Sequence, residues 1–162
     1  MAHFEVVQRL AAVSTIYDVR EPGKEEVLLI ARGASMALTP KFALMDANEK
    51  VIASLEGNFN KTEFHVLDAE RKEIASVTFP SVALKKTLAL KVGDRSYTAD
   101  AGVLALEYDF KCADDKGVVA IEVKKRIMNV RDQFTIETGE GIPREVGVLI
   151  TVAIHSRYFE VV

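Results

Sequence analysis

The stretch KFALMDANEKVIASLE, residues 41–56, is followed by a near copy of itself, EFHVLDAERKEIASVTF, at residues 63–79. DANEKVIAS and DAERKEIAS start 22 residues apart and share six of nine positions. Each copy consists of an apolar stretch, a polar five-residue loop and a second apolar stretch, which is the pattern of a β-hairpin. Because one hairpin is marginally stable in water, the copies predict neighbouring hairpins of one larger sheet.

An aspartate opens each polar loop, Asp46 in the first copy and Asp68 in the second. Its carboxylate can accept hydrogen bonds from backbone N–H groups just downstream, which favours a tight turn. Beyond the loops, Ile52 and Ser54 alternate with alanine, as a strand requires. We therefore expect the loops to fix the register of the strands.

The same pattern recurs elsewhere with the loops REPGKEE (20–26), GDR (93–95) and ADDKG (113–117). The stretch VLALEYDFKC, residues 103–112, is interpreted as one strand that leads through ADDKG into VVAIEVKKRI. With FEVVQ and QFTIET at the two ends of the series, about twelve strands follow one another at a short, regular spacing. That spacing is typical of an antiparallel barrel or sandwich, and two clear copies fit a meander better than a solenoid.

Lys125 departs from the alternation of its strand. Val119, Ile121 and Val123 share one face, Ala120, Glu122 and Lys124 the other, and Lys125 falls on the apolar face. Either the strand has left the core at Lys125 or a β-bulge intervenes.

The C-terminal stretch REVGVLITVAIHSRYFEVV, residues 144–162, does not follow the hairpin pattern. Pro143 and Glu145 suit the start of a helix. Apolar residues surround that helix on all sides, which predicts a buried helix. The β-branched residues would equally suit a buried strand, and periodicity leaves both readings open.

Length and composition predict one domain over residues 1–162 and a cytoplasmic location. The lone Cys112 cannot form an internal disulfide, and the opening MAHFEVVQRL lacks the basic-then-apolar design of a secretory signal. The longest apolar run, residues 146–154, falls short of the roughly 20 residues that a spanning helix needs, so we expect no transmembrane segment. A net charge of -3 gives no general attraction to nucleic acid.

These elements together resemble the tubby C-terminal-like superfamily, and within it the LURP-one-related and phospholipid-scramblase-like branches. The resemblance rests on the hairpins that open at Phe42 and Phe64, on GVVAIEVKKR (117–126), on QFTIETGEG (133–141) and on the apolar C-terminal segment. It implies a mainly β fold: a closed, roughly twelve-stranded antiparallel barrel of hairpins, with a buried hydrophobic C-terminal helix through its centre.

The sequence also departs from those relatives. Scramblases carry a Pro-rich segment and a Cys-rich palmitoylation cluster ahead of the barrel, whereas this chain has 4 Pro and 1 Cys in all, so we expect no anchoring by those means. Members of the superfamily often place an aspartate on each side of the terminal helix, where this sequence has Arg144 and His155.

Motifs for catalysis and metal binding are absent from the sequence. An EF-hand loop from Asp46 would put Val51 at the required glycine, and the three histidines lack ligand spacing, so His155 is expected to be structural. Cys112 is interpreted as a small core residue, and Glu107 and Asp109 as a solvated strand face. We therefore predict no metal, no cofactor and no enzymatic activity.

Basic residues are the candidates for a surface site: Lys85, Lys86, Lys124, Arg126 and Arg131. If they converge, they could hold an anionic lipid headgroup, since each Lys or Arg near a charged bilayer contributes about 1 kcal/mol. The alternative is ordinary solvent-facing charge, diluted by Glu122. No aromatic residue alternates with these residues in the sequence, which argues against nucleic acid as a partner.

The function expected from the resemblance is a non-enzymatic binding or scaffold module of LURP-one-related type. Its outer surface would recognise an anionic lipid such as a phosphoinositide, at the periphery of a membrane, or a protein partner. Two alternatives stay open at this point: a phospholipid-scramblase-like protein acting at membranes, and an enzyme or small-molecule carrier with an external cleft.

Overall fold

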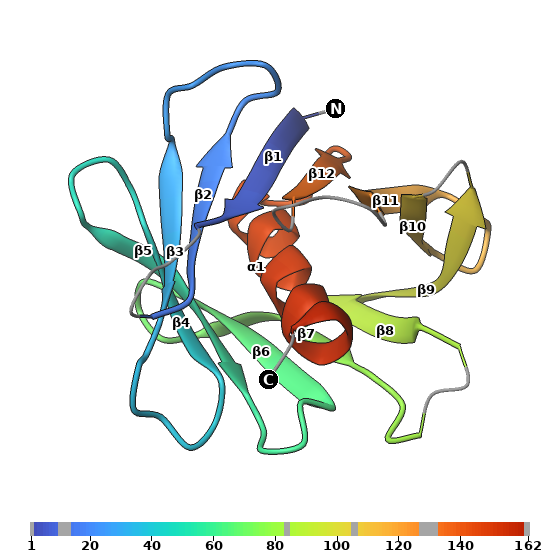
Figure 1. Cartoon of the computed structure of the whole chain (residues 1–162). Helices are drawn as coiled ribbons and strands as arrows, with labels where there is room; N and C mark the ends of the chain where they lie inside the picture. Colours follow the sequence, from blue (N-terminus) through green and yellow to red (C-terminus); the bar gives the residue numbers. More distant parts are fainter. Residues whose placement is uncertain (1, 10–13, 83–84, 105–106, 127–132, 161–162) are drawn as a thin grey trace.

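The computed structural model describes residues 2–9, 14–82, 85–104, 107–126 and 133–160. Twelve antiparallel strands pair with their neighbours in chain order, and β1 pairs with β12 to close the barrel (Figure 1). The closed twelve-stranded barrel is thereby confirmed. The strands are β1 (Ala2–Gln8), β2 (Ile16–Arg20), β3 (Leu29–Gly33), β4 (Lys41–Met45), β5 (Val51–Gly57), β6 (Glu63–Asp68), β7 (Glu73–Thr78), β8 (Thr87–Val92), β9 (Arg95–Leu104), β10 (Glu107–Ala113), β11 (Val119–Arg126) and β12 (Gln133–Thr138).

The prediction of a single strand over residues 103–112 was wrong. Val103 and Leu104 end β9, Glu107 begins β10, and Leu104 pairs with Glu107 in antiparallel register. The chain therefore reverses between the two strands. The sequence between Leu104 and Glu107 contains no Gly, Pro, Asn or Asp, so the usual signal of a turn was absent.

The repeated hairpins are β4–β5 and β6–β7, and their loops are built alike. Asp46 Oδ1 accepts the N–H groups of Asn48 and Lys50 at 2.9 and 3.0 Å. Asp68 Oδ1 accepts those of Glu70 and Lys72 at 3.0 and 2.9 Å. The predicted turn chemistry is therefore confirmed, and Asp114 repeats it in the loop between β10 and β11.

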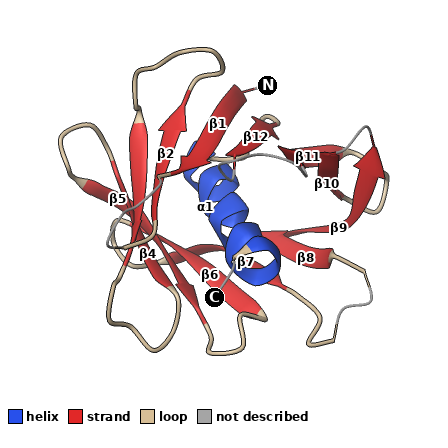
Figure 2. Ribbon diagram, in the orientation of Figure 1, coloured by secondary structure: helices blue, strands red, loops and turns tan. Residues whose placement is uncertain are grey.

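The C-terminal segment is a helix, α1 (Arg144–Ile154), followed by a π-helical turn, η1 (His155–Phe159). Residues 146–154 are all buried, and α1 lies inside the ring of strands (Figure 2). A strand in the lumen would leave its backbone groups unpaired, because each barrel strand already pairs on both sides. A helix satisfies its backbone internally, which decides the ambiguity left by the periodicity.

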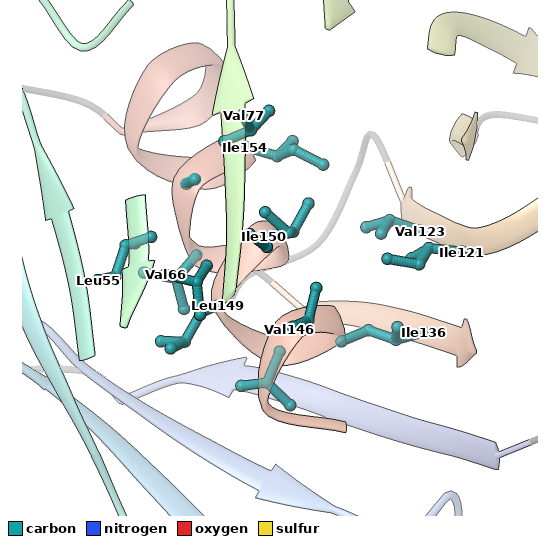
Figure 3. Packing of buried hydrophobic residues seen from close by; sticks show 14 of the residues in the cluster. Leu55, Val66, Val77, Ile121, Val123, Ile136, Val146, Leu149, Ile150 and Ile154 are labelled. Carbon is teal, nitrogen blue, oxygen red and sulfur yellow. The ribbon is translucent and has the colours of Figure 1, made fainter. Parts of the chain in front are cut away.

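Apolar side chains from all around the barrel meet α1 and form the core. Four helix residues lie among inward-facing strand residues (Figure 3): Val146, Leu149, Ile150 and Ile154 with Leu55, Val66, Val77, Ile121, Val123 and Ile136. Small residues make room for the helix, since a Cβ added at Gly147 would lie 2.6 Å from Thr138 Cγ2. The lumen is therefore filled by side chains.

Neither of the two alternatives predicted for Lys125 is found in the structure. It pairs with Tyr108 and Phe134 in unbroken register, so no bulge intervenes, and its side chain stays inside, with the residue only 6% exposed. Its ammonium donates to the carbonyl oxygen of Arg126 at 3.1 Å and lies 5.0 Å from the centroid of the Phe159 ring. A long side chain can thus stay in register near the end of the barrel and hold its charge against an aromatic ring.

Candidate functional site

The end of the barrel at which α1 stops, called the mouth below, is closed by η1. Tyr158 Oη donates to the carbonyl of Thr87 at 2.6 Å and accepts the N–H of the same residue at 3.1 Å. Arg157 Nη2 donates to the carbonyl of Pro80 at 2.7 Å. Burial raises the pKa of Tyr158, so this hydroxyl stays a donor over a wide pH range. These bonds fix η1 to the strand and loop around it.

His155 is the first residue of η1 and is buried. Its Nδ1 forms a hydrogen bond with the hydroxyl of Tyr17, which is also buried. The imidazole ring meets the rings of Tyr17 and Phe134 edge to face, with centroids 5.4 and 5.8 Å away. These contacts agree with the structural role expected for His155, since they join the end of the helix to β2 and β12.

Lys86 lies at the mouth beside three aromatic rings. Its Nζ is 5.3 Å from the centroid of Tyr108 and 5.9 Å from those of Tyr158 and Phe159. Such placement is an attractive cation–π interaction, and it restricts the rotamers of the long side chain. Lys85, the neighbour in sequence, is exposed. Together they place positive charge at the rim of the barrel.

Lys124 and Arg126 lie on the outer wall of β11 among acidic residues. Lys124 Nζ is 3.8 Å from Glu122 Oε1, and Arg126 Nε is 3.8 Å from Glu107 Oε1. A hollow of about 370 Å³ on this wall is lined by Glu5, Glu107, Lys124, Arg126, Gln133 and Thr135. Its charges are of both signs, so the dilution by Glu122 considered from the sequence is present in the structure.

Asp109 was expected on a solvated strand face, and that prediction was wrong for this residue. Its side chain is only 19% exposed and lies on the same wall as Glu122. Burial, and then the hydrogen bond and charge of Glu122, raise the pKa of Asp109, while Lys111 and Lys124 act in the opposite direction. The wall therefore holds two adjacent carboxylates with basic neighbours.

The structure divides the predicted basic residues between two surfaces. Lys85 and Lys86 belong to the mouth, Lys124 and Arg126 to the outer wall, and Arg131 lies outside the described residues. Sequence reasoning missed the rings of Tyr108, Tyr158 and Phe159 around Lys86. The adjacent Tyr158 and Phe159, directly after the apolar helix, were a usable signal, whereas nothing near Tyr108 connects it with residue 86.

Cys112 lies fully buried in β10, and desolvation raises the pKa of its thiol to about 12. A thiol that stays protonated is a poor nucleophile, in agreement with the core role expected for it. Within the described ranges no three His, Cys, Asp or Glu side chains gather as metal ligands, and no helix there is long and apolar enough to cross a membrane.

A comparison with known protein families gives a match over most of the chain. The profile of a family described as LURP-one-related matches residues 3–155, from the first strand to the first residue of η1. No curated protein matches the chain. The matched range covers the barrel and the helix that fills it.

Proposed function

Because the chain belongs to the LURP-one-related family, we propose that it is a non-enzymatic binding module that recognises an anionic lipid headgroup, such as that of a phosphoinositide, at the mouth of its barrel. A peripheral position at the cytoplasmic surface of a membrane goes with this proposal. Family membership alone specifies no ligand, since one fold carries many functions. The proposal therefore rests on the charges at the mouth.

The observation that carries the proposal is the charge of the mouth loops. Their described segments, residues 9, 14–15, 34–40, 58–62, 79–82 and 85–86, contain Arg9, Lys61, Lys85 and Lys86 and no acidic residue. Arg9 pairs with Asp18 of β2 at 2.8 Å. Glu160, which follows η1, pairs with Lys61 at 2.7 Å. Lys85 and Lys86 thus have no carboxylate partner among the ion pairs of the described residues, in contrast to the wall residues Lys124 and Arg126.

Lys86 and Lys85 are suited to different parts of the interaction. The rings around Lys86 hold its ammonium in place, which lowers the entropy lost when a phosphate binds. Lys85 is exposed and can adjust to the position of a headgroup.

Flotation of vesicles with and without phosphoinositide, across a salt series, tests the proposal. The variant Lys85→Glu/Lys86→Met should weaken binding roughly a hundredfold, given about 1 kcal/mol for each unit of charge removed or reversed. The wall variant Lys124→Glu/Arg126→Glu is the matched control and should weaken it less. Binding should fall with rising salt, because exposed charges are screened.

Two outcomes would contradict the proposal in different ways. Equal or greater loss in the wall variant would move the headgroup site to the outer face of β11. No binding of the wild-type chain at low salt would rule out lipid recognition and leave a protein partner, to be identified by pull-down. Circular dichroism and thermal unfolding of each variant would show that the barrel is intact.

A further inference from the structure

Four large apolar side chains stand exposed on the loops of the mouth. Met36, Leu38, Phe59 and Val82 are 94%, 89%, 77% and 85% exposed, and they come from the loops β3–β4, β5–β6 and β7–β8. The other large apolar residues exposed in the described chain, Val51, Val103 and Val118, are 45–60% exposed. We call these four residues the apolar rim.

The apolar rim borders the end of η1. A hollow of about 300 Å³ is lined by Leu38 and Phe59 together with Lys61, Ser156 and Glu160, so the first two loops adjoin the turn. Val82 follows Pro80 and Ser81, whose carbonyl oxygens accept hydrogen bonds from the guanidinium of Arg157. In an antiparallel meander successive loops alternate between the two ends of the barrel, which places all three loops at the mouth.

The loops at the opposite end carry charge of the other sign. Ten acidic residues of these loops outnumber the five basic ones, Lys24, Lys50, Arg71, Lys72 and Lys116. The acidic residues are Glu21, Glu25, Glu26, Asp46, Glu49, Glu70, Asp94, Asp114, Asp115 and Glu140. At the mouth Glu160 is the acidic residue of the described loops, and it is paired with Lys61. Although the formal net charge is only -3, the charged residues of the loops are distributed unequally along the barrel axis, with basic residues at the mouth and mostly acidic residues at the opposite end.

An anionic bilayer matches this combination of features. It attracts the basic mouth, repels the acidic end, and takes up apolar side chains that project from separate loops at its interface. A protein partner would have to supply separate pockets for the four side chains. We propose that the apolar rim inserts into the interface of an anionic bilayer, with the barrel axis upright and the acidic loops turned away from the membrane.

This inference rests on the proposed lipid recognition and adds which side chains enter the bilayer and how the barrel stands on it. Lys85 and Lys86 adjoin Val82 in the same loop, so a headgroup bound by the lysines would bring the apolar rim to the depth of the interface. Charge and apolar contact would then act together, as stable attachment of peripheral proteins generally requires.

Tryptophan fluorescence can test the inference without background, because the chain contains no Trp. Phe59→Trp and Leu38→Trp each place a single indole in the apolar rim. On addition of vesicles that contain phosphatidylserine, the emission of these tryptophans should shift to shorter wavelengths. Brominated lipids in the vesicles should quench that emission. Val118→Trp, in the β10–β11 loop at the acidic end, is the matched control and should show neither effect.

Affinity gives a second readout. Leu38→Asp/Phe59→Asp should reduce partitioning into those vesicles at least tenfold, whereas Val118→Asp should leave it unchanged. Vesicle flotation with unshifted rim tryptophans would overturn the inference and leave the proposed function standing. Absence of flotation at low salt would overturn both. A blue shift that appears without vesicles and grows with protein concentration would also overturn the inference. It would show that the apolar rim contacts a second copy of this chain and not a bilayer.

Discussion

Glu49 and Arg71 occupy the fourth position of their five-residue loops with φ of 62° and 68°. In the loop that Asp114 opens, Gly117 likewise stands three residues after the aspartate, with φ 82°. For residues with a Cβ the left-handed region costs about 1–2 kcal/mol, and glycine avoids that cost. The two copies thus retain residues that are conformationally unfavourable at this position.

Glu49→Gly should therefore raise the free energy of unfolding, by about 0.5 kcal/mol after the greater freedom of glycine in the unfolded chain is subtracted. Glu49 is the better site for this substitution, because replacing Arg71 would also remove the hydrogen bond of its guanidinium to Glu56 at 2.7 Å. Urea denaturation would measure the change. Gly117→Ala is the reciprocal control and should lower the free energy of unfolding by about 1 kcal/mol; stabilisation by that change would contradict the conformational explanation.

At the level of elements, the fit of α1 within the barrel depends on Gly147. Glycine in a helix interior costs about 1 kcal/mol relative to alanine, so its presence in a filled lumen requires a reason. The reason is close approach: a Cβ there would lie 2.6 Å from Thr138 Cγ2 and 3.7 Å from Ile136 Cγ2. Thr138 is β-branched and buried, which limits how far it can give way.

Gly147→Ala should accordingly destabilise the protein by about 1–3 kcal/mol despite its higher helix propensity, because the methyl group overpacks the contact. Thermal and urea unfolding would show the loss. In the background Thr138→Ser, which removes the Cγ2 methyl, the same change should cost much less. Equal cost in both backgrounds would show that another contact is responsible.

For the whole molecule, the barrel and its helix form one core. Val146, Leu149, Ile150 and Ile154 are fully buried against strands from around the barrel. A chain that ends at Pro143 should lose cooperative unfolding, bind hydrophobic dyes and aggregate, because a barrel of this size cannot collapse onto an empty lumen. Circular dichroism and light scattering would test this. A soluble truncated chain with a cooperative transition would contradict the role assigned to α1.

Site prediction succeeded where local patterns sufficed and failed where distant segments meet. Lys85 and Lys86 could be selected as an adjacent basic pair, but their aromatic neighbours come from β10 and η1. Lys124 and Arg126 share a strand face, as expected, yet their acidic neighbours Glu107 and Glu5 come from other strands. The sign of a surface depends on such lateral neighbours.

The sequence by itself determined the number of strands, the turn chemistry of the repeated loops and the burial of the terminal segment, because hairpin registers and helix periodicity are encoded within a few residues. The resemblance implied a terminal helix, but periodicity left helix and strand open. The tertiary structure decided between them, since a closed barrel leaves no free edge in its lumen. It also separated the basic mouth from the acidic end: antiparallel strands send alternate loops to opposite ends, so charges that nearly cancel along the chain are sorted in space.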